Sequence, residues 1–240
     1  MKSIVLLHGL CGSPAYFEEL EPLLDANVVA LTLPGHAGAE AGPDTMDQFA
    51  DWVMEEIRIR AIHKPIVLGH SFGGYITTNL VRRYADELSG FGLIHSTAAD
   101  DSEEAREKRN GAINKVIEEG VVPFIDVMIP GVFSETSDSI LIERAKAIGY
   151  EMTKEGIISA QQAIRDRENE VETVRSTTLP GLFIYGTKDP NMDEERAFLG
   201  AERHTTSVVP FSHMGMMEAP VQEAEIINKW LKGVGMNGEV

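Results

Sequence analysis

Short apolar runs alternate along much of the chain with longer segments whose apolar residues recur every three or four positions. Buried parallel strands read as continuous apolar runs, whereas surface helices show a period near 3.6. The alternation therefore predicts an α/β fold, with a mostly parallel six-stranded sheet flanked by helices. The expected strands are residues 4–7, 28–33, 65–68, 91–94, 181–185 and 205–209.

Amphipathic helices are expected between these strands and near the end of the chain. Thr45 has the side chain of an N-cap residue and directly precedes one such helical pattern. Residues 233–240 are expected to form a frayed tail. The helices expected in this part of the chain are residues 15–24, 45–60, 75–84 and 221–231.

The pattern changes between residues 98 and 178, where strand signals are absent and charge-rich helical segments dominate. We interpret 98–178 as a helical cap subdomain inserted into an α/β core formed by residues 1–97 and 179–240. Its expected parts are helices over 102–119, 140–153 and 157–174, and an apolar segment over 121–133 that Pro123 and Pro130 break.

A Gly-x-Ser-x-Gly sequence, Gly69 to Gly73, joins the third expected strand directly to an expected helix. A tight strand-to-helix turn strains its central residue and leaves no room for a Cβ at the flanking glycines. It also holds the serine hydroxyl at a helix N-terminus, which favours developing negative charge. We therefore predict that Ser71 is a nucleophile; the alternative is that Ser71 only caps the helix.

A serine nucleophile needs a base, and the base needs a carboxylate to orient it. His213 follows the last expected strand, at the carboxyl edge where open α/β sheets bind ligands. Asp189 follows the fifth strand at the same edge, and an Asx turn before Pro190 is compatible with this role. The chain order Ser71, Asp189, His213 is the order of this triad in G-x-S-x-G proteins.

The competing residues are less well placed for this chemistry. His63 and His204 precede strands and so belong at the opposite edge, and the His70 side chain is expected to point away from Ser71. Asp100 and Asp101 follow the fourth strand and are weaker candidates for the acid.

The loop His8-Gly9-Leu10 ends the first strand at the productive edge. Its backbone can aim an N–H group at the oxygen that becomes negative during acyl transfer, so we predict an oxyanion hole formed by the N–H groups of Leu10 and Phe72. Side chains expected near the substrate are those of His36, His95, Phe72, Phe124, Met128 and Phe133.

Together these segments resemble the α/β-hydrolase superfamily. The chain is similar to its short members, which lack an N-terminal hairpin, and residues 156–180 resemble the capped group of enol-lactonases, small carboxylesterases and cofactor-free haloperoxidase-like enzymes. A serine nucleophile argues against dehalogenases and epoxide hydrolases, which carry Asp at this position. The matching segments are residues 8–13, Pro34-Gly35-His36, residues 69–74, residues 186–190, Ser212-His213 and Glu218-Ala219-Pro220.

The resemblance and the residues imply hydrolysis of a small carboxylic ester, lactone or thioester through an acyl-enzyme, without metal or cofactor. One alternative is a carbon–carbon bond hydrolase or lyase that uses the same residues, since the menaquinone-pathway synthase of the superfamily has a similar Pro34-Gly35-His36 stretch. Another is a ligand receptor that binds without turnover.

The composition limits the partners and the location. With 43% hydrophobic and 25% charged residues the chain is typical of a soluble globular protein, and its net charge of −17 disfavours nucleic acid and anionic membranes. Cys11 is the sole cysteine, so no intramolecular disulfide can form. The apolar run at residues 4–7 is too short for a signal peptide. We expect a cytoplasmic protein, either monomeric or homodimeric.

Overall fold

The computed structural model describes residues 1–234, so the end of the expected tail, residues 235–240, lies outside the described part. All six predicted strands are present, and every strand pair is parallel. They form one sheet in the order β2-β1-β3-β4-β5-β6. The strands are β1 Ser3–Leu7, β2 Asn27–Leu31, β3 Ile66–His70, β4 Gly90–Ile94, β5 Gly181–Gly186 and β6 Thr205–Val209.

The strand register brings the loops that carry chemistry to one edge of this sheet. Leu7 of β1 pairs with Gly69 of β3, and His70 pairs with Ile94 of β4. Strands β3, β4 and β5 are buried along their whole length, which explains their uninterrupted apolar runs. The segments that follow the strands therefore meet at the carboxyl edge, as ligand sites of open α/β sheets require.

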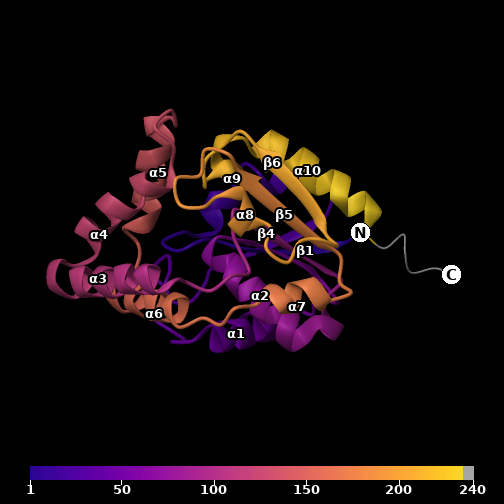
Figure 1. Cartoon of the computed structure of the whole chain (residues 1–240), viewed down its shortest axis with the longest axis horizontal. Coiled ribbons are helices and arrows are strands. Elements are labelled where there is room, and N and C mark those ends of the chain that lie inside the picture. Colours follow the sequence, from indigo (N-terminus) through magenta and orange to yellow (C-terminus); the bar gives the residue numbers. More distant parts are fainter. Residues whose placement is uncertain (235–240) are drawn as a thin grey trace.

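Helices cover both faces of the sheet. In Figure 1, α1 (Met46–Ile59) and α2 (Phe72–Tyr84) lie below the sheet, and α10 (Pro220–Gly233) lies above it. The Thr45 side chain accepts a hydrogen bond from the Gln48 N–H at 3.3 Å, which confirms the predicted N-cap. Two short helices, α8 (Glu194–Ala197) and α9 (Gly215–Glu218), follow β5 and β6.

The segment between β4 and β5 is helical. Helix α3 packs against α4 and α6 to one side of the sheet, whereas α7 contacts α2 (Figure 1). The expected helix 157–174 is divided in two: α6 ends with Asp166 as its C-cap, and α7 begins after Glu170. In the connection between them the Arg167 guanidinium donates to the Ile164 carbonyl, and the Asn169 side chain accepts from the Val171 N–H. The helices are α3 Glu103–Glu119, α4 Val121–Met128, α5 Ser139–Gly149, α6 Lys154–Arg165 and α7 Val171–Ser176.

Prolines account for two departures from the predicted helices. The continuous helix predicted over 15–24 is wrong: the chain forms the 3-10 helices Pro14–Phe17 and Glu21–Leu23, since Pro22 has no N–H for an α-helical bond. In contrast, Pro123 does not break its segment, because it lies in the first turn of α4, where N–H groups have no partner inside the helix. Pro130 does end that helix and begins the 3-10 helix Pro130–Val132.

The core beneath the site is assembled from these elements. Phe49 of α1, Phe72 of α2 and Phe91 of β4 are among its fully buried side chains. Within residues 1–234, no helix is both long and apolar enough to cross a membrane.

Candidate active site

Ser71 occupies a sharp turn between β3 and α2. Its φ is +49°, a region that a residue with a side chain rarely adopts. A Cβ on Gly69 would lie 2.1 Å from the Gly73 carbonyl oxygen, and a Cβ on Gly73 would lie 2.2 Å from the Leu7 carbonyl oxygen. Only glycine fits at both positions, so the sequence Gly-x-Ser-x-Gly is what allows helix α2 to start directly at the strand end.

Hydrogen bonds from β4 and the loop after it hold this strained turn. The Ser71 N–H donates to the Ile94 carbonyl at 3.1 Å, and the Ser96 hydroxyl donates to the Ser71 carbonyl at 2.8 Å. Ser96 was not identified from the sequence. Its signal was its place just after the fourth strand, beside the strand that ends at His70 and leads directly into Ser71.

The His213 ring and the Asp189 carboxylate form a buried pair. The His213 Nδ1–H donates to Asp189 Oδ2 at 2.5 Å, and the other carboxylate oxygen accepts the Asn191 N–H at 2.8 Å. Burial by itself would raise the pKa of Asp189, but the electrostatic interaction with the His213 ring and these hydrogen bonds outweigh it and lower the pKa. The carboxylate is therefore ionised and fixes the tautomer with the proton on Nδ1 of His213.

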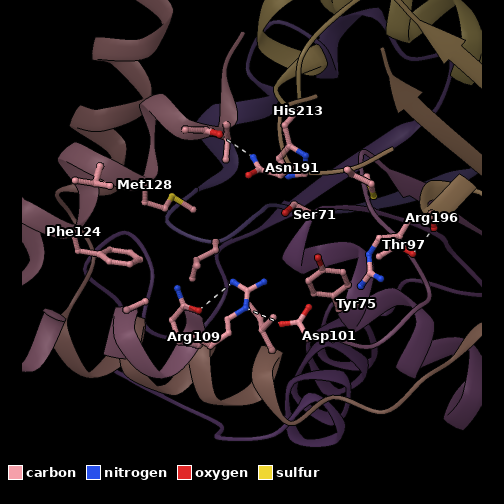
Figure 2. A pocket seen from close by; sticks show the side chains of 18 residues that line it. Ser71, Tyr75, Thr97, Asp101, Arg109, Phe124, Met128, Asn191, Arg196 and His213 are labelled. Carbon is pink, nitrogen blue, oxygen red and sulfur yellow. Dashed lines mark hydrogen bonds and ion pairs between the residues drawn. The ribbon is translucent and has the colours of Figure 1, made fainter. Parts of the chain in front are cut away.

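Ser71 and His213 line the same pocket (Figure 2). Within residues 1–234 the Ser71 hydroxyl takes part in no hydrogen bond, and it faces the pocket rather than capping α2. Nε2 of His213, the ring nitrogen not bound to Asp189, is the atom left to act on a bound group or on Ser71. The hydrogen bond between a nucleophile and its base is commonly long or poorly aligned before a substrate binds.

The loop after β1 lies against Ser71. A Cβ on Gly9 would be 3.3 Å from the Ser71 Cβ, and Leu10 lines the pocket. Neither the Leu10 nor the Phe72 backbone N–H donates a hydrogen bond inside the described part of the chain, so both remain open to an oxyanion. The buried His8 side chain holds this loop, with Nδ1 donating to the Gly9 carbonyl and Nε2 accepting the Leu33 N–H.

The pocket has a volume of about 420 Å³, within the range of small-molecule sites. One wall is apolar and includes side chains from α4, and another part is polar and includes two arginines. The apolar lining consists of Leu10, Ala112, Phe124, Val127, Met128, Val132, Ile164 and Met192. The polar lining consists of Ser71, Tyr75, Thr97, Asp101, Arg109, Gln161, Asn191, Arg196 and His213, and Gly131 completes the lining.

Of the side chains expected near the substrate, Phe124 and Met128 line the pocket. His36, His95 and Phe133 are not among the described residues that line it. Phe133 belongs to the buried core, and His36 stacks against Phe72 in a fully buried position that lowers its pKa to about 4.

The Phe72 and His95 side chains also lie outside the pocket. Phe72 is fully buried and packs edge-on against Phe49, so only its backbone N–H is available to the site. His95 is fully buried and pairs through Nε2 with Glu223 of α10 at 2.5 Å. Position in the sequence predicted the correct edge of the sheet for these residues, but not how deeply their side chains are buried.

A family model described as the alpha/beta hydrolase family matches residues 4–225. The chain belongs to this family. The match spans the sheet, the Ser71 turn and the segment that carries His213, and the family and its relatives indicate a hydrolase.

Three relatives are similar to this chain over nearly the whole of both chains. The (E)-2-((N-methylformamido)methylene)succinate hydrolase of Acinetobacter baylyi is 23% identical over 244 residues, covering 95% of this chain and 90% of its own. A thermophilic esterase from Thermogutta terrifontis, solved with malate bound, has a TM-score of 0.91 at 24% identity, covering 98% of this chain and 90% of its own. The enol-lactonase of Burkholderia xenovorans has a TM-score of 0.87 at 21% identity, covering 96% and 91%. The two structures establish the shared fold.

In this member of the family most of the competing residues have other partners. His204 Nε2 contacts the Val174 carbonyl at 2.6 Å, and His63 lies exposed in the connection between α1 and β3. Asp100 pairs with Arg106, and Asp101 pairs with two other arginines.

His70 has a role that sequence reasoning missed. Its Nε2–H donates to the His213 backbone carbonyl at 2.9 Å, and its ring lies 5.1 Å from the His213 ring, centre to centre. Burial, with the neighbouring His213 and His95, lowers the pKa of His70 well below its usual value. The neutral ring must carry its proton on Nε2, because a carbonyl can only accept.

Proposed function

We propose that this protein is a serine hydrolase that cleaves a small carboxylic ester, lactone or thioester through an acyl-enzyme. The observation that carries the proposal is the buried 2.5 Å contact between His213 and Asp189, in a pocket that Ser71 also lines. A nucleophile, a base and an orienting acid are the groups that acyl transfer needs.

In the proposed reaction the Ser71 hydroxyl attacks the substrate carbonyl, and His213 Nε2 accepts its proton. The Asp189 carboxylate stabilises the imidazolium that forms. The negative oxygen of the tetrahedral intermediate accepts hydrogen bonds from the N–H groups of Leu10 and Phe72. His213 then gives the proton to the leaving group, and afterwards activates a water that hydrolyses the acyl-enzyme.

We further propose that residues 98–178 act as a cap over this site, with residues 1–97 and 179–240 as the core. Support comes from the pocket lining, which combines Ser71 and His213 with side chains of α3, α4 and α6. These helices supply much of the apolar surface that would contact a substrate, so the cap would select it.

Hydrolysis of p-nitrophenyl acetate by the wild type and by Ser71→Ala tests the proposal. We expect the variant to lose more than about 10³-fold in kcat, as loss of a triad serine does. Ser207→Ala, a serine of β6 outside the pocket, is the control and should leave kcat unchanged. Ester cleavage that survives in Ser71→Ala would refute the proposal.

A fluorophosphonate probe followed by peptide mapping supplies a second test. We expect the probe to modify Ser71, and modification at another residue would point to another nucleophile. Labelling of Ser71 in a protein that turns over no ester, lactone or thioester would favour carbon–carbon bond chemistry. A single burst without further turnover would favour a receptor.

A further inference from the structure

Two arginine side chains from different parts of the chain line the pocket that contains Ser71. Arg109 comes from α3, and Arg196 comes from α8, after β5. Figure 2 shows Arg109 on the side of the pocket opposite His213, and Arg196 beyond Tyr75. Neither arginine takes part in the proposed acyl transfer, which leaves both free to contact another part of the substrate.

The Arg109 guanidinium is held in place and still has donors to spare. Its Nε–H donates to Asp101 at 3.0 Å and its Nη1–H to Gln161 at 3.2 Å. A guanidinium has five N–H donors, so three remain without a partner within residues 1–234. Asp101 and Gln161 therefore orient Arg109 without saturating it.

Asp101 does not neutralise this part of the pocket. The same carboxylate also pairs with Arg167 at 2.8 Å, and the Arg167 side chain is only 3% exposed. Arg167 lies in turn over the Tyr75 ring, 4.1 Å from its centre. One negative charge is thus shared by two positive charges, and the cluster of Asp101, Arg109 and Arg167 has an excess positive charge.

Arg196 adds a second positive charge without a carboxylate partner in the described chain. Its Nη2–H donates to the backbone carbonyl of Asp100 at 2.5 Å, and its own carbonyl accepts from the Thr97 hydroxyl at 2.7 Å. These bonds tie α8 to the segment after β4 and leave four guanidinium donors. The pocket therefore gathers positive charge in a chain whose net charge is −17.

Building on the proposed function, we propose that the pocket selects esters, lactones or thioesters that carry a second, negatively charged group, a carboxylate. Arg109 and Arg196 bind that carboxylate, while Ser71 attacks the carbonyl at the other end of the substrate. Partly desolvated guanidinium groups with open donors favour an anion, and their planar donor pattern matches a carboxylate. Apolar side chains such as Phe124 and Met128 contact the carbon chain between the two ends.

Kinetics on a matched pair of substrates test this proposal. Monomethyl adipate carries the carboxylate, and methyl 6-methylheptanoate replaces it by an uncharged group of similar shape. We expect wild-type kcat/KM to be at least about tenfold higher for the half-ester, a ratio typical of one hydrogen bond to a charged group. Arg109→Met and Arg196→Met should each reduce this ratio about tenfold, mainly through KM, because they remove binding rather than chemistry.

Matched variants separate charge recognition from folding. Arg106→Met removes an arginine of the same helix and its ion pair with Asp100, but Arg106 does not line the pocket, so the substrate ratio should not change. Thermal unfolding checks that each variant is folded. If Arg109→Met does not fold, Arg196→Met decides, since it lies on another element and breaks no described ion pair.

Binding is measured separately from catalysis, by titrating monomethyl adipate into Ser71→Ala and into Ser71→Ala with Arg196→Met. Binding that the second substitution weakens about tenfold supports the anion subsite even if no ester is turned over, which would refute only the proposed hydrolysis. Conversely, ester turnover that depends on Ser71 but shows no preference for the half-ester, with ratios unchanged in both arginine variants, overturns the subsite and leaves the hydrolase proposal standing.

Discussion

The imidazole Nε2–H of His70 donates to the backbone carbonyl of His213, 143 positions further along the chain. The residue next to the candidate nucleophile thus holds the loop that carries the candidate base. This hydrogen bond sets the distance between Ser71 and the His213 backbone. The hydrogen bond to Asp189 sets the orientation of the His213 ring. The site therefore depends on contacts between the ends of β3, β5 and β6.

His70→Ala is expected to release the His213 loop. The buried His213 carbonyl loses its donor, which costs about 1–3 kcal/mol of stability, and misplacement of the base lowers kcat on the order of 10- to 100-fold. His204→Ala is the control, because the His204 ring bonds a carbonyl in the same way but far from the pocket. Denaturation and ester kinetics measure both effects. An equal loss of kcat in both variants would show that His70 acts only through general stability.

Asp189→Asn is expected to lower kcat by about 10⁴-fold, because an amide disfavours the tautomer in which His213 Nε2 accepts a proton. The pKa of Asp189 is lower in the folded protein, so the ionised carboxylate stabilises the fold above its unfolded pKa of about 3.9. That stabilisation is lost as the pH falls through the lower, folded pKa.

Asp138→Asn is the control for this substitution. Asp138 caps α5, outside the pocket, and Asn serves as an N-cap equally well, so neither kcat nor stability should change. Kinetics near neutral pH and denaturation across pH 2–7 provide the measurements. A kcat within tenfold of wild type in Asp189→Asn would count against the assigned role.

Gly73→Ala is expected to destabilise the protein by more than about 3 kcal/mol, because the added Cβ would meet the Leu7 carbonyl at 2.2 Å and backbone cannot yield easily. Gly111→Ala provides the comparison. It lies in α3 with nothing within 4 Å of the new Cβ, so it should stabilise the helix by about 0.5–1 kcal/mol. The prediction fails if both variants unfold at the same denaturant concentration.

His36→Asn is expected to reduce the loss of stability in acid. Burial lowers the pKa of His36 to about 4 in the folded protein, whereas the unfolded chain titrates near 6.5. The unfolded state therefore binds more protons between these values, and the free energy of unfolding falls by about 3 kcal/mol as the pH drops from 6.5 to 4. Asn keeps a donor for the Pro34 carbonyl and does not titrate.

Denaturation of His36→Asn at pH 7 and at pH 4.5 measures this effect. The exposed His63, changed to Asn, is the control and should leave the pH dependence as in the wild type. The buried His8 and His70 contribute in the same direction, since burial also lowers their pKa values. Identical pH dependence in His36→Asn and the wild type would contradict the assignment.

The local pattern of apolar and polar residues was sufficient to predict the sheet and to place the candidate residues along its edge. Parallel strands place their carboxyl ends at one edge, so a residue such as Asp189 or His213 could be assigned to that edge from chain order alone. The Ser71 turn was equally readable, because only glycine tolerates the contacts at positions 69 and 73. These features follow from backbone geometry and from the succession of apolar runs and amphipathic segments, both of which are local properties of the sequence.

Tertiary packing decided how deeply each side chain is buried and in which direction it points. His36 and His95 follow strands at the correct edge. His36, however, stacks on the Phe72 ring in the core, and His95 pairs with Glu223 of the distant helix α10. Arg109 is one of several charged residues on α3, and its entry into the pocket depends on how α3 packs against α6. Sequence spacing determines the edge of the sheet that a side chain reaches. Whether that side chain then meets solvent, substrate or core depends on elements brought together from far along the chain.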